Sequence, residues 1–151
     1  SFFIDTFNFF LYDALRQCEY PALAGIAEKS VKEIAYHAQW SAEWVIRLGD
    51  GTQESREKVQ KSIDDLWMWT GELFEVHPVF NQLGSGFVDF STLKTQWLDK
   101  VVHILETATL KMPDKEAWMQ TGGRLGVHTS HLGYLLAEMQ SLPRTYPNAS
   151  W

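Results

Sequence analysis

Two side chains in the first third of the sequence are of types that could bind a metal ion. Glu33 and His37 are four residues apart, so on a helix they lie one turn apart on the same face. A carboxylate and an imidazole inside a helical bundle are typical of a carboxylate-bridged di-metal site. In that site the spacing is Glu-x-x-His, contributed by each of two helices. Here the third residue after Glu33 is Tyr36, which cannot replace an imidazole.

Two interpretations of this pair remain open. Glu33 and His37 could bind a metal together with further carboxylates, or they could form a partly buried hydrogen bond or ion pair. Asp5 offers one carboxylate, but no predicted helix carries Glu-x-x-His. We therefore predict no metal in this chain and only a degenerate site. The candidate residues of that degenerate metal site are Glu33, Tyr36, His37 and Asp5.

The C-terminal part of the sequence holds two further candidates. His128 and His131 are three apart; they could share one metal or hydrogen-bond neighbouring loops. A glycine-containing tetrapeptide precedes them and could bind an anion through backbone N–H groups. It lacks the lysine and the spacing of a P-loop, so a tight connecting turn is the alternative. The candidate anion-binding residues are Thr121, Gly122, Gly123 and Arg124.

Helices must position these side chains, because every periodic segment fits a repeat of 3.6 residues better than one of 2. The longest lies within 21–52, with Gly49 directly after its last periodic residue. The predicted helices cover about 2–19, 21–49, 53–76, 92–110 and 129–142, separated by prolines and glycines. Residues 77–90, with Gly84 and Gly86, are predicted to form a loop. We expect an all-α single domain over 1–151 with about five helices.

Apolar side chains cover nearly the whole circumference of the helix at 2–19. Such a helix needs partners on all sides, so we expect either a piece of a longer chain or a second chain that covers it. The last helix is expected to turn five side chains inward: Leu132, Leu135, Leu136, Met139 and Leu142. Five tryptophans are expected to be core and interface anchors: Trp40, Trp44, Trp67, Trp69 and Trp97.

Composition excludes several classes of partner. The formal net charge of −6 over 151 residues disfavours nonspecific nucleic-acid binding. No apolar run reaches the roughly 18 residues of a membrane span, so we expect no nucleic-acid and no membrane partner.

Cys18 is the only cysteine, which rules out an internal disulfide and fits a reducing cytoplasm. We expect a cytoplasmic protein.

Four blocks of sequence resemble one family. The run TGGRLGVHTSHLGYLLAEMQ at 121–140 closely resembles the C-terminal signature of the PaaC family, which belongs to bacterial phenylacetyl-CoA epoxidase (ring 1,2-phenylacetyl-CoA monooxygenase). The other three blocks are FIDTFNFFLYDAL near the start, KEIAYHAQWSAEWVIRLGDGT at 32–52 and LWMWTGELF at 66–74. The resemblance covers the whole chain in order and corresponds to the larger, C-terminal part of the family. The resemblance implies that the family's N-terminal helices are not part of this sequence.

The resemblance implies a ferritin-like helical bundle within a multicomponent oxygenase of phenylacetate degradation. It implies that the di-iron centre and the CoA ester are held by a paralogous, PaaA-type subunit, while this chain is its non-catalytic structural partner without a cofactor. The alternative is a catalytic di-metal subunit in its own right. A free-standing bundle without an oxygenase link is a third interpretation, and self-association is left open.

Overall fold

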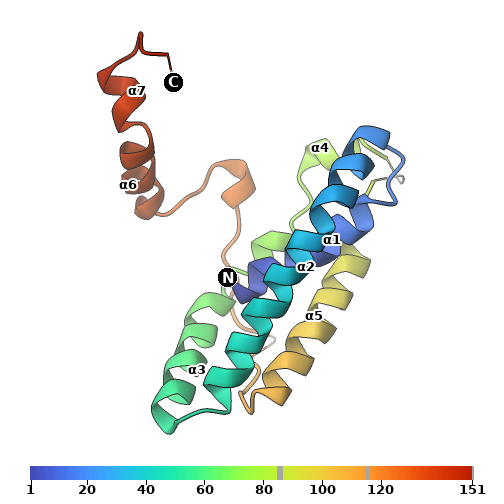
Figure 1. Ribbon diagram of the computed structural model, residues 1–151, viewed down its shortest axis with the longest axis vertical. Helices are drawn as coiled ribbons and strands as arrows, with labels where there is room; N and C mark the ends of the chain where they lie inside the picture. Colours follow the sequence, from blue (N-terminus) through green and yellow to red (C-terminus); the bar gives the residue numbers. More distant parts are fainter. Residues whose placement is uncertain (85–86, 115, 151) are drawn as a thin grey trace. The chain divides into compact units, whose positions relative to one another are not determined.

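Helices are the regular secondary structure of this chain (Figure 1). The computed structural model describes residues 1–84, 87–114 and 116–150. The α-helices are α1 (Phe2–Leu15), α2 (Pro21–Gly49), α3 (Gln53–Trp67), α4 (Pro78–Asn81), α5 (Phe90–Thr107), α6 (Ser130–Met139) and α7 (Ser141–Thr145). Short 3₁₀ helices are η1 (Gly71–Phe74) and η2 (Gly123–Leu125). The described residues contain no strand, so the predicted all-α fold is confirmed.

Local sequence explains where the long helices begin and end. Pro21 occupies the first turn of α2, where its missing N–H costs nothing. Thr52 caps α3 by accepting a hydrogen bond from the N–H of Ser55 at 3.2 Å. The helix predicted to begin near 92 begins earlier, at Phe90, because the Asp89 side chain accepts from the N–H of Ser91 and caps α5.

Several predicted boundaries are wrong. The first helix ends at Leu15 instead of 19, and the third ends at Trp67 instead of 76. The buried Thr70 hydroxyl donates to the Trp67 carbonyl at 2.8 Å, which satisfies a helix-end oxygen and leads the chain into η1. The predicted loop at 77–90 contains the short helix α4, and Gly86 lies outside the described residues.

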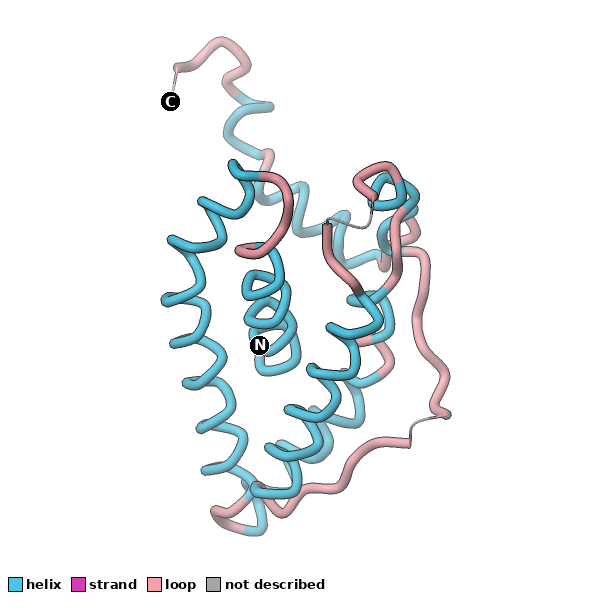
Figure 2. The backbone as a smooth tube through the Cα atoms, turned by 90° about the vertical axis from the view of Figure 1, so that its right-hand side faces the viewer, coloured by secondary structure: helices cyan, strands magenta, loops and turns pink. Residues whose placement is uncertain are grey.

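The chain divides into two compact units, Ser1–Gln120 and Thr121–Trp151. The expectation of one domain stays a prediction. Within the first unit, α2 packs against α1, α3 and α5, and α1 also packs against α5. Figure 1 shows α3 and α5 running beside α2, and Figure 2 shows the same helices from the side. None of the described helices is long and apolar enough to cross a bilayer.

An aromatic cluster forms the centre of the first unit. The Trp67 and Trp97 rings stack with centroids 5.8 Å apart, and Phe3 lies edge-on to Trp67 at 5.7 Å. The buried Trp97 indole N–H donates to the Phe3 carbonyl at 2.9 Å. Aromatic pairs of this kind contribute about 0.5–1.5 kcal/mol beyond the burial of their surface. The first turns of α1 are therefore anchored to α5 through Trp97.

The second unit differs from the first in that its described residues form no buried core. None of its described residues is buried. Of the five side chains predicted to face inward, Leu132 is half-buried and the other four are exposed, as Leu135 and Met139 show. About thirty residues give a helix too little surface within its own unit to pack against. The predicted end of the last helix at Pro143 is also wrong. Pro143 lies in the first turn of α7, where proline removes no needed hydrogen bond.

Candidate functional site

The predicted metal pair lies on the outer face of α2. The Glu33 Oε1 and His37 Nε2 atoms are 3.8 Å apart, with side chains 81% and 57% exposed. That distance is too long for a hydrogen bond, and an ion pair this exposed contributes less than about 1 kcal/mol. Both the metal hypothesis and the hypothesis of a partly buried pair predict side chains that are less exposed than these two.

The other residues of the degenerate site do not complete a ligand set. Tyr36 is exposed and places its ring beside His37, with centroids 5.8 Å apart. Asp5 lies half-buried on α1. Across the described residues, no three His, Cys, Asp or Glu side chains are grouped so that they could hold a metal ion. The residues present therefore do not fit a di-iron centre, and the predicted lack of metal stays a prediction.

The candidate anion site forms a tight turn around two glycines. Gly122 and Gly126 have φ angles of 93° and 88°, in the left-handed region. The N–H groups of Leu125 and Val127 both donate to the Gly122 carbonyl, at 2.9 and 3.0 Å. The amides of these two residues, which follow the candidate tetrapeptide, therefore serve the turn. Anion binding at residues 121–124 stays a prediction, and His128 is exposed beyond this turn.

Among the described residues, one side chain has a strongly shifted pKa, and it serves structure. The hydroxyls of Thr92 and Ser91 and the Ser91 N–H donate to the Asp89 carboxylate and lower its pKa to about 2. Hydrogen bonds to the ionised form favour that form. Asp89 therefore acts as a charged cap of α5.

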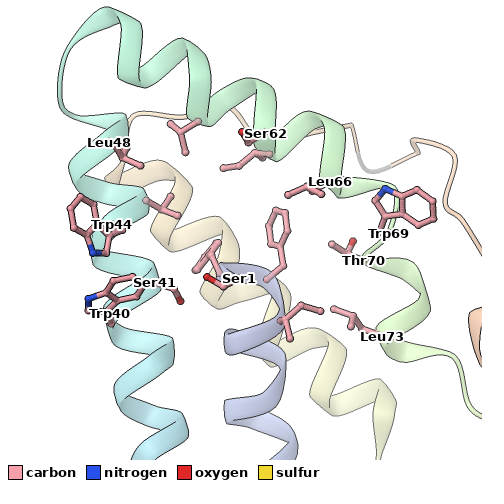
Figure 3. A pocket seen from close by; sticks show the side chains of 16 residues that line it. Ser1, Trp40, Ser41, Trp44, Leu48, Ser62, Leu66, Trp69, Thr70 and Leu73 are labelled. Atoms are coloured by element: carbon pink, nitrogen blue, oxygen red, sulfur yellow. The ribbon is translucent and has the colours of Figure 1, made fainter. Parts of the chain in front are cut away.

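The first unit contains an apolar groove of about 480 Å³ (Figure 3). Figure 3 shows Trp40 and Trp44 on one side, with Leu66 and Trp69 on the other. The apolar groove comprises Ser1, Phe2, Phe3, Ile4, Trp40, Ser41, Trp44, Val45, Leu48, Val59, Ser62, Ile63, Leu66, Trp69, Thr70 and Leu73. These residues come from α1, α2, α3 and the segment that follows α3.

Large aromatic side chains stand exposed at the rim of the groove. Trp40 and Trp44 are 50% and 43% exposed, and their rings meet edge to face at 6.0 Å. The Arg47 guanidinium lies 5.8 Å from the centroid of the Trp44 ring, a cation–π distance. Tryptophans placed one turn apart along α2 thus form a ridge that remains partly in water.

Three of the four hydroxyl groups in the groove have hydrogen-bond partners. Ser62 donates to the Lys58 carbonyl at 2.9 Å, and Thr70 donates to the Trp67 carbonyl. Ser41 points its hydroxyl to the Ala38 carbonyl at 3.4 Å. The groove therefore offers apolar contact, with no ionisable side chain in its lining to transfer protons. Sequence reasoning identified its tryptophans as anchors but did not predict that they share one groove with α1 and α3.

Comparison with known proteins gives a consistent result. Residues 1–151 match a family described as "Phenylacetic acid catabolic protein". The chain is 40% identical over 153 residues to one of the subunits of the 1,2-phenylacetyl-CoA epoxidase of Escherichia coli (strain K12). That match covers 100% of this chain and 61% of the relative. The chain thus spans less than two thirds of the length of this curated relative.

Proposed function

This chain belongs to the phenylacetic acid catabolic protein family, as its resemblance predicts, and we propose that it is a non-catalytic structural subunit of a multicomponent phenylacetyl-CoA oxygenase. In this proposal the chain supports a paralogous, PaaA-type catalytic subunit that holds the di-iron centre. The name of the Escherichia coli relative, which makes it one subunit of an epoxidase, supports a place in such a complex.

The apolar groove is the observation that carries the structural role. Large apolar side chains that are exposed together around a groove are typical of an interaction site. Here Trp40, Trp44 and Leu66 are all more than one third exposed around one groove. Fully burying a large apolar side chain contributes about 1.5–3 kcal/mol, so a helical surface laid over this groove would be held firmly. We propose that the catalytic subunit supplies that surface.

The alternative function is a catalytic di-metal subunit. Activating oxygen requires a metal with open coordination positions held by several ligands. A di-iron bundle draws those ligands from four helices, with two Glu-x-x-His motifs turned inward. In this chain Tyr36 stands at the histidine position, and Glu33 and His37 point to solvent. This geometry favours the structural role over the catalytic alternative.

A binding experiment tests the role of the groove. The full-length protein is produced with its catalytic partner, and the dissociation constant is measured for wild type and Trp40→Lys. A lysine would place a charge in a desolvated apolar contact, so we expect affinity to fall by at least a hundredfold, about 2.7 kcal/mol. Because Trp40 is half exposed, the isolated protein should keep its helical circular dichroism.

Trp118→Lys is the matched control. Trp118 is 65% exposed in the same unit and does not line the groove, so its replacement should leave the affinity unchanged. Equal affinity of wild type and Trp40→Lys would overturn partner docking at this groove. So would a changed oligomeric state of the Trp40→Lys variant alone, because that would show a second copy of the chain at the groove.

Activity measurements separate the structural role from the catalytic alternative. The full-length protein should not oxidise phenylacetyl-CoA alone, yet it should be needed for turnover by, or solubility of, the catalytic subunit. The interface should be of the obligate type, roughly 2,000 Å² or more in total. Turnover by this protein alone with a reductase, or two tightly bound irons per chain by elemental analysis, would establish the catalytic alternative instead.

A further inference from the structure

We draw no further inference here: the strongest candidate, the exposed apolar face of α6 formed by Leu135, Leu136 and Met139, carries nothing because nothing in the structure shows what covers it.

Discussion

Replacing Gly49 by alanine should destabilise the first unit. Gly49 ends α2 where the helix meets the end of α5, and both Gly49 and Ala108 are buried. A Cβ atom at Gly49 would overlap the Ala108 carbonyl oxygen and lie 2.9 Å from the Ala108 Cβ. It would also lie 3.1 Å from the Leu110 Cγ. Two of these three atoms belong to a residue with no exposed surface, so the contact is relieved only by moving the backbone of one helix.

The expected size of the effect combines two opposing contributions. Overpacking a well-packed core costs about 1–3 kcal/mol, and a backbone oxygen that cannot rotate away places Gly49→Ala at the upper end. Helix propensity favours alanine over glycine by up to about 1 kcal/mol. We therefore expect a net loss of about 1–2 kcal/mol in the free energy of unfolding. For a chain of this size that lowers the melting temperature by roughly 2–8 °C.

The segment that Gly49→Ala would displace also accepts three hydrogen bonds. The Gly49 carbonyl accepts from the Arg56 side chain at 2.8 Å and from the Thr109 hydroxyl at 3.4 Å. The neighbouring Leu48 carbonyl accepts from the Ser55 hydroxyl at 2.7 Å. Because these bonds link α2 to the starts and ends of other helices, a shift at Gly49 should loosen amide protection there first. Hydrogen exchange followed by mass spectrometry would show this as faster exchange in peptides spanning residues 46–56.

Gly25→Ala provides the matched control, since it is the same substitution in the same helix. Apart from the backbone of its own helix and its chain neighbours, no atom lies within 4 Å of a Cβ added at Gly25. Only helix propensity acts there, so we expect stability to rise by up to about 1 kcal/mol. Urea denaturation of both variants measures the two free energies. The reasoning is refuted if Gly49→Ala is as stable as Gly25→Ala, because the close contact with Ala108 would then cost nothing.

Three further predictions follow from other parts of the structure. Trp97→Phe removes the N–H that donates to the Phe3 carbonyl and should lower the free energy of unfolding by about 1–3 kcal/mol; a change below about 0.5 kcal/mol in urea denaturation would contradict this. The pKa of Asp89 is lowered from 3.8 to about 2 in the folded chain, so its stabilising contribution is present above pH 3.8 and is lost as the pH falls through 2. The stability difference between wild type and Asp89→Asn should therefore shrink over that window in acid titrations, and a constant difference would count against the cap. Replacing Glu33 and His37 together by glutamine should leave turnover of the reconstituted complex within about tenfold of wild type, because both side chains are exposed. A hundredfold loss in a folded, partner-bound double variant, about 2.7 kcal/mol of barrier, would make the pair a working site.

Local rules account for the parts of the fold that the sequence predicted well. The course of α2 follows from its apolar periodicity, with Pro21 in its first turn and Gly49 at its end. Boundaries failed where single hydrogen bonds decided the helix end. After α3 the backbone changes to bonds that span three residues, as from the Thr70 N–H to the Trp67 carbonyl, and Asp89 caps α5 ahead of the predicted start. Periodicity counts apolar spacing and does not register such single hydrogen bonds.

The sequence by itself determined the helical class, the family and the mismatch of the metal motif, because these depend on residue types at short spacing. Only the tertiary structure decided which faces are covered. Glu33 and Trp40 lie two turns apart on α2, yet one is solvated and the other borders the apolar groove. The reason is that burial depends on how close α1 and α3 come to each turn of α2. Those contacts join residues far apart in the sequence, so no local pattern can specify them.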